Sequence, residues 1–219
     1  MLDTKEFIDQ LAKDNEEFYN KQQKWAKSYW PDKLSHEALI ISLKTRFWNE
    51  LLGAEAIARF MLKLDNVNLK ILVGRQVGDE AKHSHYVKKR IQALGGNIGE
   101  PLKEQLDYIE TLDSFDYPEE FFAAQQFTVE TQSIKRNKQA EDTLDKETVE
   151  MFKKHVNNDE VFHSRLGYLG LTYYCTNELS QTKAKEAAKL IREKHMAISL
   201  ANYNLLKLHG CLVGSSLYE

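Results

Sequence analysis

Apolar residues recur every three or four positions along most of this chain, the spacing that brings side chains to one face of an α-helix. Only three prolines and ten glycines interrupt the pattern over 219 residues. The sequence therefore predicts an all-α protein, with helices at residues 4–28, 35–64, 69–94, 101–113, 118–138, 146–176 and 181–209.

Several of these boundaries carry a local signal. Pro31 follows the first helix, Gly95-Gly96 ends the third, and Pro118 opens the fifth. A chain of this length buries one sizeable core, so we expect a single domain over residues 1–219. Its centre is predicted to be a four-helix bundle over about 35–176, with the short helix 101–113 crossing between the two helix pairs and the first and last helices packed outside. The four core helices are 35–64, 69–94, 118–138 and 146–176.

Two stretches of the chain repeat one motif, Asp-Glu-x-x-His, at Asp79–His83 and Asp159–His163. An isolated glutamate, Glu50 or Glu130, stands thirty residues before the glutamate of each motif. A single Glu-x-x-His occurs readily by chance at this composition, but the added aspartate and the equal offset make a chance pair improbable.

This spacing predicts a dinuclear metal site. Residues three apart on a helix lie on nearly the same face, so the glutamate and histidine of one motif can address one ion. A glutamate from each of two helices and a Glu-x-x-His from each of two others is the ligand set of di-iron and di-manganese carboxylate bundles. The predicted ligands are Glu50, Glu80, His83, Glu130, Glu160 and His163.

The alternative is that both motifs are solvated helix faces with weak Glu–His pairs. Helical phase argues against it, because Glu160 and His163 share a stripe with Phe152 and Val156, and Glu130 lies one turn from Phe127. Buried carboxylates repel one another unless cations neutralise them, and two divalent ions would cancel four such charges.

On the first metal helix, Glu55 competes with Glu50 as the ligand. Glu50 shares its stripe with Leu43 and Phe47, whereas Glu55 has Arg59 one turn ahead as a surface partner. We therefore predict Glu50.

Asp79 and Asp159 stand next to the predicted ligands but point about 100° away around their helices. A metal-bound imidazole commonly donates its free N–H to a carboxylate. We expect each aspartate to hold the histidine of the other motif helix; the alternative is a solvated acid.

Composition narrows the remaining options. The net charge of −3 gives no sign of nucleic-acid binding, and no apolar run is long enough to cross a membrane. The first residues lack a cationic leader, and Cys175 and Cys211 fit reduced thiols, so a cytoplasmic location is expected. The apolar faces of the first and last helices are compatible with a homodimer.

The motif residues resemble the ferritin-like di-iron carboxylate superfamily over about residues 35–176. The matching strings are Glu50–Gly53, Asp79–His83 and Glu160–Gly167, and they are most similar to the catalytic subunit of the phenylacetyl-CoA epoxidase type. The resemblance implies a ferritin-like bundle and two iron ions, with manganese or a mixed centre as options. It also implies Glu50 with His83 and Glu130 with His163 as terminal ligands, and Glu80 and Glu160 as bridges.

Differences from other branches of this superfamily narrow the range of activities that we expect. Val87 stands where a ribonucleotide reductase subunit has its radical tyrosine, and Ile134 where bacterial multicomponent hydroxylases have a threonine. We expect an oxidoreductase that activates dioxygen to oxidise a small organic substrate, with a reductase or ferredoxin as electron donor. No catalytic residue beyond the metal centre is predicted. The alternatives are a ferroxidase or peroxide-removing protein and a non-catalytic structural or docking subunit.

Overall fold

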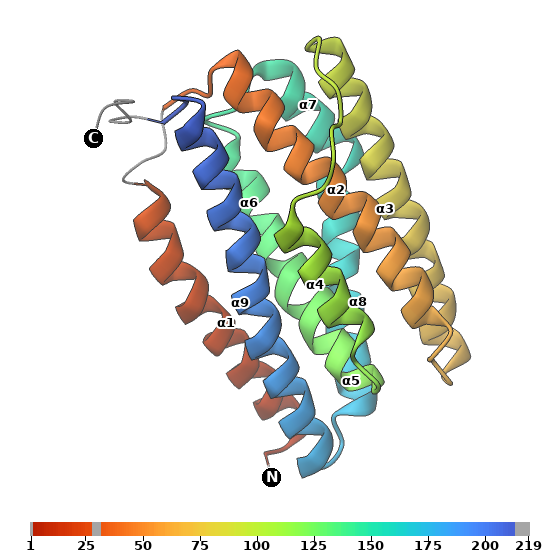
Figure 1. Ribbon diagram of the computed structural model, residues 1–219. Coiled ribbons are helices and arrows are strands. Elements are labelled where there is room, and N and C mark those ends of the chain that lie inside the picture. Colours follow the sequence, from red (N-terminus) through yellow and green to blue (C-terminus); the bar gives the residue numbers. More distant parts are fainter. Residues whose placement is uncertain (1, 28–31, 213–219) are drawn as a thin grey trace.

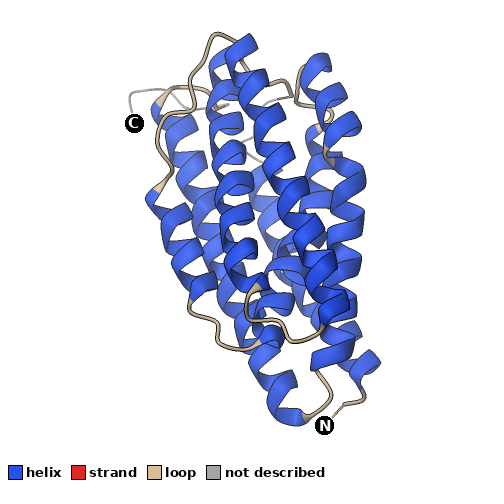
Figure 2. Ribbon diagram, turned by 90° about the vertical axis from the view of Figure 1, so that its right-hand side faces the viewer, coloured by secondary structure: helices blue, strands red, loops and turns tan. Residues whose placement is uncertain are grey.

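The computed structural model describes residues 2–27 and 32–212, and all regular structure among them is helical (Figure 2). The predicted all-α class is confirmed. The predicted end of the first helix at Ser28, with Pro31 after it, lies outside the described residues. The elements in chain order are α1 (Thr4–Lys27), α2 (His36–Met61), α3 (Val67–Ala93), α4 (Lys103–Asp113), α5 (Pro118–Phe121), the π-helix η1 (Phe122–Glu130), α6 (Thr131–Ala140), α7 (Lys146–His155), α8 (Asn157–Tyr174) and α9 (Glu178–Leu208).

The long helices lie side by side along roughly one direction (Figure 1). α2 packs against α3 along most of its length, while η1 is covered by α8 and by α9. The short α4 bridges α2 and α9. α2, α3, η1 and α8 carry the motif residues and therefore form the part of the fold that positions the candidate site.

Side-chain caps explain where several helices begin. Ser35 accepts a hydrogen bond from the backbone N–H of Ala38, and Asn66 accepts one from Leu69, so each satisfies a free donor in the first turn. Gly95 adopts a φ of 75° just after α3, as a helix-ending glycine does. These local signals place the boundaries within a few residues of the predicted ones.

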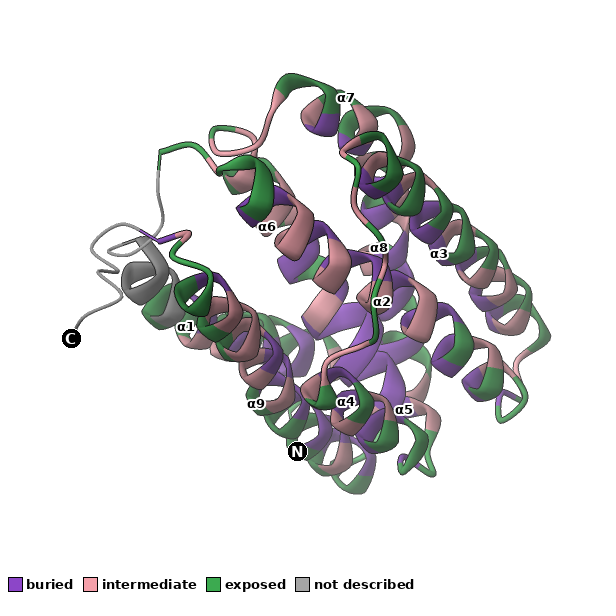
Figure 3. Cartoon of the chain, turned by 45° about the horizontal axis from the view of Figure 1, so that its top comes forward, coloured by how far each residue is buried: buried purple, intermediate pink, exposed green. Residues whose placement is uncertain are grey.

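A polar layer separates the two larger apolar clusters of the described interior. On α2, Phe47 belongs to one cluster and Ala56 to the other, with Glu50 between them. α3 repeats the order, since Val73 and Val87 belong to different clusters on either side of the motif. Buried positions accordingly concentrate where α2, α8 and the π-helix meet (Figure 3). The apolar clusters hold the four helices in register and the polar layer is enclosed between them.

Two predicted helices are not continuous α-helices. The segment predicted as 118–138 contains the nine-residue π-helix, which widens the turn immediately before Glu130. The segment predicted as 146–176 breaks at Val156, whose φ of −125° and ψ of −57° separate α7 from α8. Neither place has a proline or glycine to signal the irregularity.

The last helix is more central than predicted. Its buried residues Ile191 and Ile198 belong to the same apolar cluster as residues of α2, α3 and α8. It was expected outside the core because it carries no motif, but packing against η1 buries one of its faces. α9 therefore contributes to the interior that surrounds the candidate site.

Cys175 and Cys211 are both free thiols, as the sequence predicts. Across the described residues, we find no helix that combines the length and apolar character needed to cross a bilayer.

Gly167 sits where α8 approaches η1 most closely. A Cβ at this position would lie 2.6 Å from the backbone nitrogen of Phe127, so Gly167→Ala should push the two helices apart. We expect it to lower the free energy of unfolding by about 2 kcal/mol, despite the better helix propensity of alanine. Gly78→Ala is the matched control, because no atom lies within 4 Å of its Cβ position. It should stabilise by up to about 1 kcal/mol. Urea unfolding of both variants tests this, and equal stability of Gly167→Ala and the unaltered protein would contradict it.

Candidate metal centre

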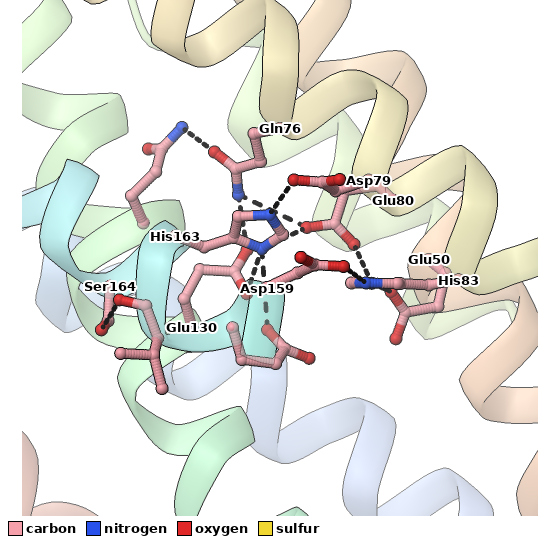
Figure 4. A network of polar contacts seen from close by, with 12 residues as sticks. Glu50, Gln76, Asp79, Glu80, His83, Glu130, Asp159, His163 and Ser164 are labelled. Carbon is pink, nitrogen blue, oxygen red and sulfur yellow. Dashed lines mark hydrogen bonds and ion pairs between the residues drawn. The ribbon is translucent and has the colours of Figure 1, made fainter. Parts of the chain in front are cut away.

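The structure brings all six predicted ligand side chains into the polar layer, and all are buried. Figure 4 labels each of them except Glu160. α2 supplies one, α3 two, the end of η1 one and α8 two. They are Glu50, Glu80, His83, Glu130, Glu160 and His163.

Five of the six form two groups that share one glutamate. In the first, His83 Nδ1 lies 3.2 Å from Glu50 Oε2 and 3.5 Å from Glu80 Oε2. In the second, His163 Nδ1 lies 3.0 Å from Glu80 Oε1 and 3.9 Å from Glu130 Oε2. Within each group the candidate ligand atoms are within 4.8 Å of one another. Glu80 thus directs one oxygen to each group, the arrangement needed in a bridging carboxylate.

Glu160 is buried beside these groups but belongs to neither. Its Oε2 is 3.7 Å from His163 Nδ1, while its Oε1 accepts a 2.6 Å hydrogen bond from Arg46. The symmetrical bridging role that the family resemblance implies for Glu160 therefore stays a prediction.

The two motif aspartates lie across the site from their own histidines. Asp159 Oδ2 is 3.2 Å from His83 Nε2, and Asp79 Oδ2 is 3.5 Å from His163 Nε2. This reciprocal pairing is the one predicted from helical phase. It leaves Nδ1 of each imidazole facing the glutamates. Lys82 ties the two aspartates together, with Nζ 2.6 Å from Asp159 and 3.3 Å from Asp79.

The competing carboxylate on α2 points to solvent. Glu55 is exposed and its nearest cation is Arg59, at 3.9 Å. Glu50, five residues earlier on the same helix, is buried. The choice of Glu50 over Glu55 agrees with the structure.

Arg46 is a central residue of the site that the motif analysis missed. Its buried guanidinium pairs with Glu50, one turn along α2, and reaches across to Glu160 on α8. The i, i+4 spacing of Arg46 and Glu50 is visible in the sequence, but it equally describes a surface ion pair. The contact to Glu160 depends on the packing of two helices far apart in sequence.

A set of buried amides surrounds Glu130. Gln76 and Gln125 donate to Glu130 Oε1 at 3.1 and 2.9 Å, and Gln126 donates to Gln76 Oε1 at 3.3 Å. Tyr108 in turn donates to Gln125. Gln125 and Glu130 are five residues apart, a separation that the i, i+5 hydrogen bonding of the π-helix brings into line. An α-helical period does not predict this alignment.

Electrostatics divides the four glutamates into two pairs. Burial opposes ionisation of Glu50 and Glu160, but the attraction of Arg46 and the histidines is stronger. Both carboxyl groups therefore have pKa values below the ordinary range, and the pKa of Glu160 is lowered to about 2. Glu80 and Glu130 have raised pKa values because burial and neighbouring carboxylates disfavour their charged forms. The second pair therefore tends to hold protons when no cation is bound.

The histidines compensate the remaining negative charge. Burial disfavours their cationic forms, yet Glu50 and Glu80 raise the pKa of His83 to about 11, and Glu80 with Asp79 raises that of His163 further. Without metal, protons thus occupy the places where cations would act.

The residues fit a metal centre. His163 Nδ1 and Glu160 Oε2 are buried and make no hydrogen bond of good geometry, although Glu80 lies within ion-pair distance of the imidazole, and a metal ion would satisfy both atoms. Carboxylate oxygens with imidazole nitrogens suit iron or manganese. The site can therefore hold metal, and Glu80 is placed to join two ions.

No protein-family model matches this chain, and no curated protein matches it significantly. The likeness to ferritin-like proteins thus rests on the motif residues.

Removing Arg46 tests how the site is balanced. Arg46→Met leaves Glu50 and Glu160 buried without their cation, so the metal-free protein should lose about 3–5 kcal/mol of stability. Divalent metal should raise the melting temperature of this variant more than that of the unaltered protein. Arg59→Met removes an exposed ion pair and should cost less than about 1 kcal/mol. Calorimetric melting with and without metal measures both, and equal losses in the two variants would argue against a central role for Arg46.

Metal loading should release protons. At neutral pH the raised pKa values of His83 and His163 keep protons on the imidazoles, the raised pKa of Glu130 favours its protonated form, and a metal needs all three groups deprotonated. We expect roughly two to three protons to leave per pair of Mn²⁺ ions at pH 7, and affinity to rise with pH. Titration calorimetry in buffers of different ionisation enthalpy counts them. Affinity independent of pH would contradict this picture.

Proposed function

We propose that this protein is a ferritin-like di-iron oxidoreductase, in which iron, or manganese in its place, activates dioxygen to oxidise a small organic substrate. The observation that carries the proposal is the pair of buried Glu/His groups sharing Glu80. When bound, the two ions would supply the electrons that reduce dioxygen. An external donor, such as a reductase or ferredoxin, would return the electrons.

The protein's own residues prepare that chemistry. Asp79 and Asp159 fix the orientation of the histidines and leave each Nδ1 free to bind metal. The amides of Gln76 and Gln125 hold Glu130 in place. The apolar clusters on either side of the polar layer limit its contact with bulk water, which reduces side reactions.

The cavity beside the site favours an organic substrate over free iron. Among the residues lining it, the acidic ones are the four glutamates of the centre itself, and the others are basic, polar or apolar. A ferroxidase draws in Fe²⁺ and is served by an acidic entry path. The two arginines that line this cavity, Arg46 and Arg136, carry the opposite charge.

Iron reconstitution tests the activity. Protein loaded anaerobically with Fe²⁺ and then mixed with oxygen should consume oxygen and show a transient charge-transfer absorption. Glu80→Ala removes the shared carboxylate and should abolish oxygen uptake and lower the iron content, whereas Glu55→Ala, on the exposed side of α2, should retain both.

The same experiment separates the alternatives. A ferroxidase would oxidise many Fe²⁺ ions per chain, and a peroxide-removing protein would consume peroxide faster than oxygen. For a structural or docking subunit, metal removal would lower the melting temperature while no oxidant is consumed. Any of these results would overturn the proposed oxygenase.

A further inference from the structure

A cavity of about 50 Å³ lies against the candidate metal centre. The four glutamates line one part of it, and α6 and α9 contribute Arg136, Ser133 and His195. Its volume is enough for roughly three or four water molecules, or for a short organic ligand in their place.

His195 is held as a neutral imidazole. Its Nε2 lies 2.6 Å from a guanidinium nitrogen of Arg136, and because arginine only donates, Nε2 must be the acceptor. The proton is then on Nδ1, which donates to the hydroxyl oxygen of Tyr19 at 3.0 Å. Burial, with Arg136 and Arg46 nearby, keeps the pKa of His195 well below its ordinary value. His195 therefore positions Arg136 without neutralising its charge.

Arg136 is a cation without an anion of its own. Within the described parts of the chain, no carboxylate lies within ion-pair distance, and the bond to His195 is the one hydrogen bond of its guanidinium. Burial and then the nearby Arg46 lower its pKa. The side chain still keeps part of its surface accessible, as a group facing an internal cavity does.

Metal binding would increase the excess of positive charge around Arg136. Glu50 and Glu160 pair directly with Arg46 and act on Arg136 only from a distance. Two divalent cations would cancel all four glutamates of the centre, which leaves the positive charges of Arg46 and Arg136 facing the cavity. A buried, uncompensated cation is costly, so an anion entering from solvent would be favoured.

We infer that this cavity binds the carboxylate of a short-chain organic acid through Arg136, and that this acid belongs to the substrate class of the centre. The planar fork of a guanidinium matches a carboxylate with two parallel hydrogen bonds. Leu52, Ile109 and Val129 line the same cavity and would contact the short alkyl chain. The substrate part of this inference rests on the proposed function.

Binding is measured without turnover by titration calorimetry on Zn²⁺-loaded and metal-free protein. The probes are acetate, propionate and butyrate, each compared with its neutral amide. We expect the carboxylates to bind more tightly than the amides, and more tightly to the Zn²⁺ form. Arg136→Met should weaken carboxylate binding at least about tenfold, the loss expected for a charge-assisted hydrogen bond. Arg165→Met changes an exposed arginine in the same way and should leave binding unaltered.

Several outcomes would overturn the inference. If amides bind as tightly as carboxylates, charge recognition is absent. If Arg136→Met binds carboxylates as tightly as the unaltered protein does, the acid is held by the metal and not by Arg136. Arg136→Lys keeps the charge but not the fork, so it should bind with intermediate affinity and still prefer carboxylates. If Arg136→Met fails to fold, the lysine variant and the carboxylate–amide comparison decide the question.

The outcome is separable from that of the proposed function. Carboxylate binding to the Zn²⁺ form does not require oxygen chemistry, so it can be positive while the iron protein consumes no oxygen. Conversely, oxygen uptake with no preference for carboxylates would support the proposed oxidoreductase and overturn the inference that its substrate is an organic acid.

Discussion

Four glutamates buried in one layer are the constraint on which this structure depends. Carboxylates in a water-poor interior repel one another and lose their hydration, so the layer is stable only if positive charge enters it. The protein supplies Arg46 for Glu50 and Glu160, and raised pKa values favour the protonated forms of the histidines and of Glu130. Two bound divalent cations would supply this positive charge with fewer groups.

The layer is not symmetrical, although the sequence motifs that build it are. Arg46 stands on the side of Glu50 and Glu160, whereas glutamine amides surround Glu130. A guanidinium competes with a metal for carboxylate oxygens, but an amide donor only orients the carboxylate that accepts from it. An ion bound between Glu80, Glu130 and His163 would therefore have less competition from the protein than one bound between Glu50, Glu80 and His83.

Periodicity and spacing predict those features that depend on one helix at a time. The inward face of Glu50, the exposed position of Glu55 and the direction of each motif aspartate away from its own histidine follow from the α-helical repeat. The π-helix before Glu130 and the break at Val156 do not, because no proline or glycine marks them and tertiary packing determines them. Arg46, Arg136 and His195 were missed for a related reason, since their roles come from contacts between helices far apart in sequence.

The break at Val156 and the π-helix both stand next to candidate ligands, and both affect how these side chains are oriented. A widened turn aligns Gln125 with Glu130, and a new helix start at Asn157 places Asp159 and Glu160 in a first turn, where the helix dipole favours negative charge. Regular α-helices would put these four side chains at other angles. The irregular backbone is thus part of what orients the carboxylates, and the apolar clusters on either side hold it in that form.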